Sequence, residues 1–516
     1  MSFLTLSKTI TMKRKGTLFP VLLFTMAFVL IWSCGKDDDP KPMDTMPTII
    51  DFNPASGPVG TQVTINGTHF SATPAENEVK FGNVPANVAI ATSTKLIVTV
   101  PEGATTGKFS VTVDGETATS VTNFTVTTTI ALDKSSLELF TLDNAPLTAT
   151  LNQGNNSDIT WSSDNENVAT VDENGNVTAT GSGTATITAS VDGDEATCTV
   201  TVHPNVYVAG YTTNADKISM ATSWKNGVIQ KISLGSNSSI ARSVFVKGHD
   251  TYLTGSMAND NFIYLPFLWK NGNTEDLASG LFNSIPSSVY VDGEDVYVAG
   301  YIHSGTSNMA ALWTNGGFGA LTNGDKDSSA FSVFVSDGDV YVAGYINNAD
   351  DLPVATLWKN GVIQNLPGQI PGSIAQAVYV VGNDVYLGGS YKNANNISVA
   401  VIWKNGVIQD ISDGISNAQV TSIFVKDGDV YATGTKTNGN NLAVATVWKN
   451  TTAQALADGT TSSRAYSIYL DGLDIYVAGD VKNGNNINVA TLWKNNSAQP
   501  LSDGTINASA LGVFVK

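Results

Sequence analysis

The sequence predicts an all-β protein in which two β-sandwich domains are followed by a seven-bladed β-propeller of four-stranded blades, closed by a C-terminal strand. Three observations support this fold class. Beyond residue 46, apolar and polar residues alternate in short runs, which is typical of half-buried strands. Turn-forming residues separate the runs, and 47 of the 516 residues are glycine. From residue 204 onward the chain repeats itself every 44 or 45 residues.

The first 34 residues have the features of an export signal. A basic segment at 13–15 precedes an apolar run over 18–32, and Ser33 comes just before Cys34. The run is shorter than the roughly 20 residues that a membrane-spanning helix needs. This arrangement resembles the lipobox of bacterial lipoproteins, in which the cysteine thiol is acylated. We therefore expect a signal peptide over residues 1–34 with lipidation at Cys34.

Residues 35–46 carry charges and two prolines, and they have few apolar side chains. This composition predicts a disordered tether. Its beginning, Gly35-Lys36-Asp37-Asp38-Asp39, resembles the acidic export signal of lipoproteins that reach the outer face of some Gram-negative outer membranes. A solvated charge run in a linker is the alternative interpretation. We expect an outer-membrane location facing the cell exterior, with the membrane as one partner through the lipid anchor.

Residues 47–127 predict the first β-sandwich. An Asn-Pro-Ala-Ser-Gly turn at 53–57 is followed by alternating strands at 61–67, 96–100 and 109–113. These motifs resemble an IPT/TIG domain over its full length. The resemblance implies an immunoglobulin-like fold, and we expect this domain to serve as a spacer.

Residues 128–203 predict a second sandwich. Strand patterns at 159–164, 168–172 and 183–189 resemble a group 2 bacterial Ig-like (Big2) domain. Trp161 is expected in the core of this sandwich. Cys198 lies in phase with the apolar residues of its strand, so we expect a small buried side chain and not a nucleophile.

Residues 204–516 contain seven copies of one unit. Tryptophan and tyrosine each recur once per copy, at Trp224, Trp269, Trp313, Trp358, Trp403, Trp448 and Trp493, and at Tyr207, Tyr252, Tyr297, Tyr341, Tyr386, Tyr431 and Tyr476. In one copy the pattern predicts strands at 332–335, 340–345, 354–358 and 362–366, joined by Asp-Gly and Asn-Gly turns. Four strands per repeat predict a propeller blade, with strand 1 innermost.

The two ends of the repeat region predict how the ring closes. The region begins with a second strand at Asn205 and ends with a first strand at 511–515. The last strand should therefore complete the first blade and cover both exposed edges. The strand order resembles that of kelch-type propellers, although the kelch double glycine occurs only at Gly388-Gly389.

Residues that recur in every copy are expected to pack neighbouring blades, and this interpretation covers the seven tryptophans. The loops between strands 2 and 3, and between successive blades, lie on one face and vary among copies. Binding residues are often found on such loops. The candidate ligand-binding residues are Phe262, Tyr264, Phe282 and His303, and ordinary loop packing is the alternative.

The sequence indicates no catalytic residues, cofactor or metal site. The four histidines are scattered, and the Asp-Gly-Asp turns lack the run of oxygen ligands that calcium requires. A net charge of -18 disfavours nucleic acid as a partner.

The favoured function is a non-catalytic cell-surface lipoprotein that binds a glycan or protein ligand through the variable-loop face of the propeller. One alternative is a glycan-active lyase or hydrolase with carboxylates at the channel mouth. A structural component of a surface complex is the other.

Overall fold

The computed structural model describes residues 46–152, 158–232, 234–277, 283–303, 305–364, 366 and 369–516. The predicted signal peptide, Cys34 and residues 35–45 of the tether lie outside these ranges. Within them the chain is almost entirely β-strand, as predicted, with a short 3-10 turn η2 at Pro74–Glu76. Among the described residues, no helix has the length and apolar character needed to cross a membrane. The chain divides into two compact units between Thr127 and Thr128.

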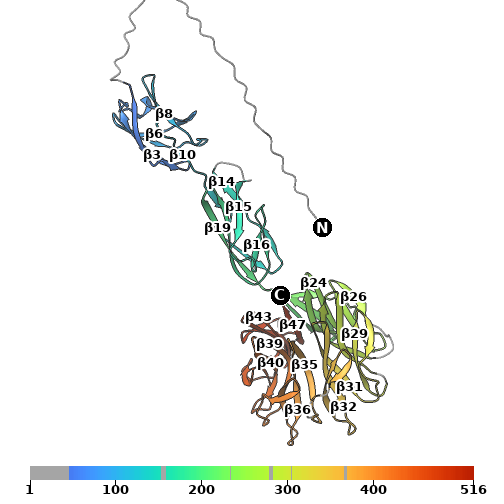
Figure 1. Ribbon diagram of the computed structural model, residues 1–516. Helices are drawn as coiled ribbons and strands as arrows, with labels where there is room; N and C mark the ends of the chain where they lie inside the picture. Colours follow the sequence, from blue (N-terminus) through green and yellow to red (C-terminus); the bar gives the residue numbers. More distant parts are fainter. Residues whose placement is uncertain are drawn as a thin grey trace, which may run out of the picture. The chain divides into compact units, whose positions relative to one another are not determined.

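The first unit is a sandwich of two four-stranded sheets (Figure 1). One sheet has the order β1-β3-β7-β6 and comprises β1 (Thr48–Asn53), β3 (Gln62–Thr68), β7 (Lys95–Thr99) and β6 (Val88–Thr92). The other has the order β5-β4-β8-β9 and comprises β5 (Val84–Ala86), β4 (Glu78–Phe81), β8 (Phe109–Val113) and β9 (Glu116–Thr119). A parallel pair links β2 (Ser56–Gly57) and β10 (Thr125–Val126). Phe81, Phe109 and Phe124 are buried together in the core.

The second unit begins with the other sandwich. Its larger sheet has the order β12-β19-β18-β15, and the smaller sheets pair β13-β17-β16 and β11-β14. The strands are β11 (Ile130–Leu132), β12 (Ser136–Phe140), β13 (Asn144–Pro146), β14 (Ala149–Leu151), β15 (Thr160–Ser163), β16 (Ala169–Val171), β17 (Asn176–Ala179), β18 (Gly183–Val191) and β19 (Asp194–His203). Cys198 is completely buried, and burial raises the pKa of its thiol. Trp161 packs on the core but is only half-buried.

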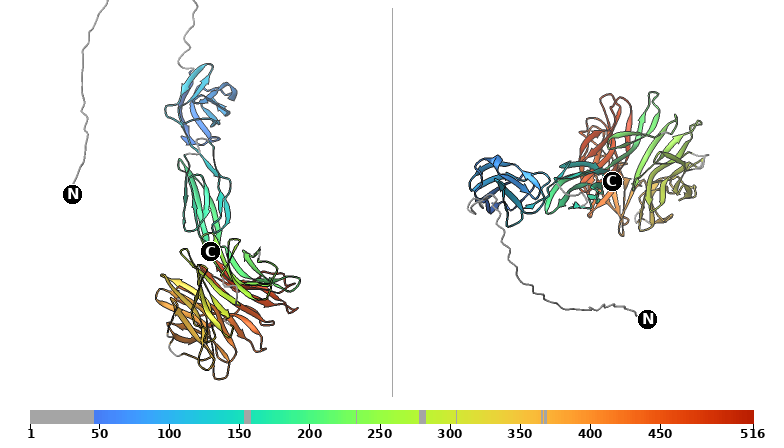
Figure 2. Two further views of the ribbon diagram at one scale, coloured as in Figure 1. Left: turned by 90° about the vertical axis from the view of Figure 1, so that its right-hand side faces the viewer. Right: turned by 90° about the horizontal axis from the view of Figure 1, so that it is seen from above.

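The rest of the second unit forms seven four-stranded antiparallel sheets, counted over the described residues, and these are the predicted blades (Figures 1 and 2). Blade 1 comprises β47 (Ala508–Val515), β20 (Val206–Thr213), β21 (Ser219–Lys225) and β22 (Val228–Lys231). Blade 2 comprises β23 (Ser239–Lys247), β24 (Asp250–Ala258), β25 (Tyr264–Lys270) and β26 (Asn273–Asp276). Blade 3 comprises β27 (Ser284–Asp292), β28 (Asp295–His303), β29 (Asn308–Thr314) and β30 (Gly317–Ala320).

The remaining blades have the same order. Blade 4 comprises β31 (Ser328–Ser336), β32 (Asp339–Asn347), β33 (Pro353–Lys359) and β34 (Val362–Gln364). Blade 5 comprises β35 (Ile374–Val381), β36 (Asp384–Lys392), β37 (Ser398–Lys404) and β38 (Val407–Asp410). Blade 6 comprises β39 (Ala418–Lys426), β40 (Asp429–Thr437), β41 (Ala443–Lys449) and β42 (Thr452–Ala455). Blade 7 comprises β43 (Ser463–Asp471), β44 (Asp474–Lys482), β45 (Asn488–Lys494) and β46 (Ser497–Pro500).

The first strands of the blades form the innermost layer, as predicted. Each contacts the first strand of the next blade, and the contact between β23 and β47 completes the cycle. A serine bridges most of these contacts: Ser243 Oγ, for example, accepts a hydrogen bond from the Val289 N–H of the next blade at 3.2 Å. These seven strands therefore surround a central channel.

The C-terminal strand closes the ring, which confirms the prediction. β47 pairs antiparallel with β20, and in Figure 1 this red strand lies beside the green strands that begin the repeats. At its end, Asn205 N–H donates to Lys516 O at 2.6 Å, and Lys516 N–H donates to Asn205 O at 2.9 Å. Both strand edges that an open array would expose are thus paired.

The seven tryptophans pack blade against blade, as the repeat pattern predicted. Each belongs to an apolar cluster that contains residues of the preceding blade: Trp224 packs with Leu492 of blade 7, and Trp358 packs with Ala310 of blade 3. Trp269 is half-buried and packs with Ala209 of blade 1. Burying an aromatic side chain of this size contributes roughly 4 kcal/mol.

A second aromatic series encircles the channel. One residue from each first strand contacts its two neighbours, with ring centroids 4.7 to 5.1 Å apart. The members of this aromatic ring are Phe245, Tyr290, Phe334, Tyr379, Phe424, Tyr469 and Phe514. A regular heptagon with sides of this length has a radius of about 6 Å, so the side chains fill most of the channel at this level.

The three tyrosines of the aromatic ring come from blades 3, 5 and 7. Burial raises the pKa of Tyr379 and of Tyr469 to about 12. Within the aromatic ring, each tyrosine contacts two phenylalanines. Phenylalanine separates them at every step.

We expect Phe424→Ala to destabilise the propeller by about 3 kcal/mol, because it opens a cavity in the aromatic ring. Phe424→Tyr should also destabilise it, since a fourth hydroxyl group would enter between Tyr379 and Tyr469. Urea unfolding followed by tryptophan fluorescence measures both effects.

Phe262→Ala is the matched control, because this side chain is 84% exposed and should contribute little to stability. Equal stability of Phe424→Ala and Phe262→Ala would contradict the structural role of the aromatic ring.

Candidate ligand-binding mouth of the propeller

A glycine in the second strand of every blade shapes the channel above the aromatic ring. A Cβ atom at Gly255 would lie 1.9 Å from Ile240 O in the first strand, and the other blades have the same close approach. The first strand bulges by one residue opposite this glycine. The glycines are Gly210, Gly255, Gly300, Gly344, Gly389, Gly434 and Gly479. Only glycine permits this approach, so the bulge is built into the repeat.

The bulge defines three positions per blade, which we call the mouth positions. They are the bulged residue, the first-strand residue two places before it, and the second-strand residue paired with that one. In blades 1 to 7 the bulged residues are Leu511, Arg242, Ser287, Phe331, Gln376, Thr421 and Tyr466. The preceding residues are Ser509, Ile240, Ile285, Ser329, Ile374, Gln419 and Arg464. Their partners are Tyr211, Ser256, Tyr301, Tyr345, Ser390, Thr435 and Asp480.

The mouth positions differ from blade to blade, whereas the surrounding framework repeats. They lie at the start of the first strand, next to the variable loops and about 10 Å along the strand from the aromatic ring. Charged and aromatic side chains gather in blades 7, 1, 2, 3 and 4, whereas blades 5 and 6 have small or uncharged residues there. The mouth is therefore an asymmetric surface within a symmetric scaffold.

A hydrogen-bond network connects blades 7 and 1. Asp480 is 2% exposed, and its Oδ2 accepts hydrogen bonds from Ser509 Oγ at 2.6 Å and Tyr466 Oη at 3.1 Å. Ser509 Oγ also lies 3.4 Å from Tyr211 Oη. Burial raises the pKa of Asp480 despite these hydrogen bonds.

Blade 4 presents an aromatic pair to the same mouth. The rings of Phe331 and Tyr345 have centroids 5.9 Å apart. Tyr345 Oη donates a hydrogen bond of 2.6 Å to Asp327 Oδ2, which fixes the orientation of the tyrosine. Burial, followed by this hydrogen bond, raises the pKa of Tyr345 to about 12.

Arg242 occupies the bulge of blade 2. Its Nε is buried without a hydrogen-bond partner, and no described residue forms an ion pair or hydrogen bond with its guanidinium group. Burial lowers the pKa of Arg242, while Tyr301, Tyr264 and Tyr211 lie close enough to act on its charge. The mouth thus contains hydrogen-bond donors that the fold leaves unused.

Three of the four sequence-predicted residues, Phe262, Tyr264 and His303, lie in or next to the loops on the side of the mouth positions. Tyr264 and His303 flank one segment, since Asn283 Oδ1 accepts the Tyr264 N–H and Asn283 O accepts the His303 N–H. Phe262 lies at the exposed tip of the β24–β25 loop, and Phe282 lies outside the described residues. A ligand role for all four remains a prediction.

Sequence reasoning missed the mouth positions themselves. The predicted first strand of blade 4 covered 332–335, whereas β31 begins at Ser328, so the bulge was assigned to a loop. Comparing the copies position by position within the strands, as well as within the loops, would have found the divergence.

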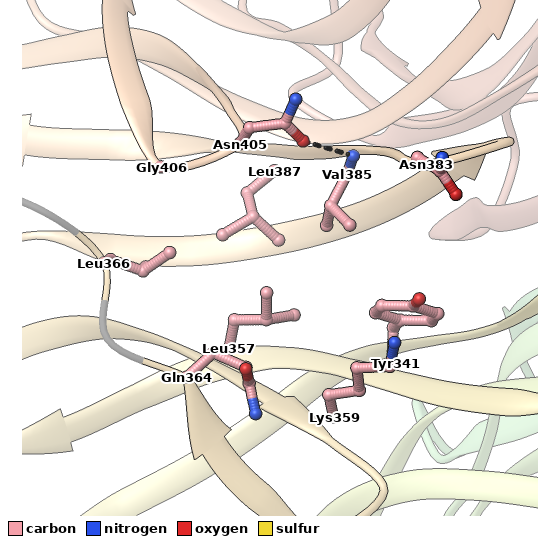
Figure 3. Close-up of a pocket in the computed structure, with 10 residues that line it drawn as sticks. All are labelled: Tyr341, Leu357, Lys359, Gln364, Leu366, Asn383, Val385, Leu387, Asn405 and Gly406. Atoms are coloured by element: carbon pink, nitrogen blue, oxygen red, sulfur yellow. Dashed lines mark hydrogen bonds between the residues drawn. The ribbon is translucent and has the colours of Figure 1, made fainter.

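A cavity of about 270 Å³ lies between blades 4 and 5, on the side of the constant turns (Figure 3). Its wall includes Tyr341 and Lys359, and Lys359 pairs with Asp339 at 2.7 Å. The same lysine, aspartate and tyrosine arrangement recurs in blades 2, 5, 6 and 7. The cavity is thus lined by framework residues, and we place the candidate site at the mouth instead. The described residues contain no group of three or more His, Cys, Asp or Glu side chains that could hold a metal ion.

Comparisons with known proteins identify the two sandwiches. The IPT/TIG domain family matches residues 47–128, and the bacterial Ig-like domain (group 2) family matches residues 126–202, so both resemblances are confirmed. A search of curated proteins gave no match.

Several solved structures are similar to parts of the chain. An auxiliary nutrient binding protein from Bacteroides ovatus is 13% identical, with 80% of this chain and 100% of that chain covered and a TM-score of 0.27. An auxiliary nutrient binding protein from Bacteroides thetaiotaomicron is 11% identical, with 92% and 95% covered and a TM-score of 0.22. A Bacteroides thetaiotaomicron protein of unknown function is 11% identical, with 76% and 96% covered and a TM-score of 0.24.

Asp480→Asn tests the electrostatics of the mouth. Because the pKa of Asp480 is raised in the folded state, its contribution to stability is lost as pH rises through that pKa. Asparagine does not titrate, so the variant does not lose stability in this way. We therefore expect the difference in free energy of unfolding, Asp480→Asn minus the unmodified protein, to increase from about pH 4 to pH 8 in urea titrations.

Asp503→Asn should show no such increase between about pH 4 and pH 8. Asp503 is exposed, and hydrogen bonds from Thr505 lower its pKa, so the stability that its charged form supplies is lost only as pH falls below the ordinary value of 3.8. A relative stability of Asp480→Asn that is constant or falls with pH would contradict the burial argument.

Proposed function

We propose that this chain is a non-catalytic surface protein that binds a glycan at the loop-side mouth of its propeller. One observation carries the proposal: the seven copies agree in the residues that build the blades and diverge at the mouth positions. A residue repeated seven times is explained by packing. Arg242 and Phe331 are not explained in that way, because the bulged position of the other blades holds leucine, serine, glutamine, threonine or tyrosine.

The chemistry of the mouth suits a sugar ligand. Aromatic rings offer apolar faces against which sugar rings stack, and hydroxyl and guanidinium groups orient them through hydrogen bonds. Tyrosine combines both properties, and Tyr211, Tyr301 and Tyr345 occupy the same second-strand position in three blades.

The carboxylates favour binding over catalysis. A glycoside hydrolase generally needs two carboxyl groups about 5 to 10 Å apart across the scissile bond. Asp327 and Asp480 are the mouth carboxylates described above, and they belong to blades 4 and 7. Each accepts a tyrosine hydroxyl group, and each is therefore engaged in the scaffold. This supports binding without turnover over the lyase or hydrolase alternative.

Phe331→Ala tests the glycan proposal. We expect a loss of affinity of about ten-fold or more for a glycan that the purified full-length chain retains on an array, because one stacking surface is removed. Phe318→Ala, on the outer strand of blade 3, is the matched control and should leave affinity unchanged. Isothermal titration with the retained glycan gives the affinities, and chromatography of the incubated glycan detects turnover.

Each outcome of that experiment decides something. Retention without cleavage supports the proposal, and cleaved products support the enzyme alternative. If no glycan is retained, the proposal is wrong. Loss of binding in Phe262→Ala but not in Phe331→Ala would move the site from the mouth to the loop tip.

We also propose that a lipid on Cys34 anchors the protein to the outer membrane, facing outward. The lipobox-like sequence before Cys34 supports this proposal. Cys34→Ala should abolish incorporation of labelled palmitate and release the protein from the membrane fraction, while Cys198→Ala should leave both unchanged. Protease added to intact cells should digest the unmodified protein if it faces outward.

A further inference from the structure

Arginine is scarce in this chain, and its placement is uneven. The sequence contains 24 lysines and three arginines, Arg14, Arg242 and Arg464. Arg14 lies in the predicted signal peptide. The other two occupy mouth positions in blades 2 and 7, which are the two neighbours of blade 1. Both arginines of residues 35–516 therefore lie at mouth positions, and every other mouth position is neutral or acidic.

Arg242 is held by packing alone. Its guanidinium group has no hydrogen bond or ion pair with the described residues, and its Nε is shielded from solvent. A partly buried charge without a partner costs free energy, so a scaffold with no use for it would be more stable with an apolar residue, such as Leu511 at the same position of blade 1.

Arg464 approaches from the opposite side of blade 1. It is exposed, and it lies beside Tyr466 and Asp480, which both raise its pKa. Asp480 already accepts two hydroxyl groups, and no ion pair between it and Arg464 occurs in the described structure. A hydrogen bond with the Tyr466 hydroxyl group raises the pKa of Arg464 and occupies part of its guanidinium group. Since this group has five N–H donors, others stay available for a ligand.

Tyr211 lies in blade 1, between the blades that carry the two arginines. On one side, its Oη lies 3.4 Å from Ser509 Oγ, which donates to Asp480, the residue paired with Arg464. On the other side, its strand β20 contacts β23, the strand that carries Arg242. Guanidinium forks match the paired oxygens of carboxylate and sulfate groups better than lysine does.

We propose that Arg242, Arg464 and the Tyr211 hydroxyl form a recognition site for an oxyanion, carboxylate or sulfate, carried by an acidic glycan. This inference rests on the proposed glycan binding and specifies the charge of the ligand. The chain has a net charge of -18 and attracts no anion from a distance. An oxyanion must therefore be bound by direct contact with the guanidinium and hydroxyl groups. A glycan can make this contact, because its sugar rings pack against aromatic side chains while its acidic groups reach the arginines.

The experiment uses an array of uronate-containing, sulfated and neutral polysaccharides. Each acidic glycan is printed beside its carboxyl-reduced or desulfated form, so that only the charge differs. We expect the full-length chain to retain acidic glycans and to lose them when the charge is removed. The member of each pair that is retained distinguishes carboxylate from sulfate.

Variants then test the two arginines. Arg242→Gln and Arg464→Gln should each weaken binding of the retained acidic glycan by about ten- to hundred-fold, and Arg242→Lys should restore it only in part. Lys217→Gln is the charge-matched control: it removes one exposed cation from a variable loop of blade 1 and should have little effect. Thermal unfolding confirms that each variant folds, and exposed Arg464 remains informative if Arg242→Gln does not fold.

The outcomes separate the two proposals. Retention of neutral glycans with unchanged affinity in both arginine variants would overturn the oxyanion site and leave glycan binding intact. Retention of acidic glycans that persists after carboxyl reduction or desulfation would also overturn it. If the chain retains no glycan of any kind, both proposals are wrong.

Discussion

The architecture depends on one constraint, which is that seven innermost strands must meet in a closed cycle. The constraint is satisfied at the seam, where β47 returns from the C-terminus to pair with β20. The aromatic ring depends on the same closure, because Phe514 supplies the contact between Tyr469 and Phe245. Phenylalanine and tyrosine cannot alternate without interruption around a ring of seven. The single pair of neighbouring phenylalanines, Phe514 and Phe245, joins the closing strand β47 to β23 of blade 2. No two tyrosine hydroxyl groups are therefore forced together along the wall.

Closure also explains why the mouth can vary. Packing between blades is carried by the tryptophans, and close pairing of the first two strands within each blade is permitted by the second-strand glycines; both repeat in every copy. The bulge opposite each glycine releases one first-strand residue from regular pairing. The bulged residue takes no part in the regular strand pairing. Residues as different as Arg242, Phe331 and Tyr466 can therefore occupy this position without disturbing the sheets. The residues that repeat in every blade stabilise the propeller, and the mouth positions, which differ among blades, form the candidate site.

The features that could be predicted from the sequence are those that recur along it. The period identified the blades, the tryptophan packing and the closing strand, and the turn pattern identified both sandwiches. It did not predict the mouth, because the bulge shifts the alternation by one residue and made the first four residues of β31 look like a loop. Nor could it bring Tyr211 and Ser509 together, since they are 298 residues apart and meet only through the seam. Trp161 shows the limit of analogy: it packs on the core as expected but stays half-buried.

The two ends of the channel differ in a way that restricts how a ligand could enter. The aromatic ring lies toward the constant turns, near the ends of the first strands. The turns themselves carry repeated lysine–aspartate pairs that are already neutralised. Above the aromatic ring lie the mouth positions, where no described residue forms a hydrogen bond with the guanidinium group of Arg242. A glycan that approaches from the loop side would therefore meet these donors before it met the aromatic ring.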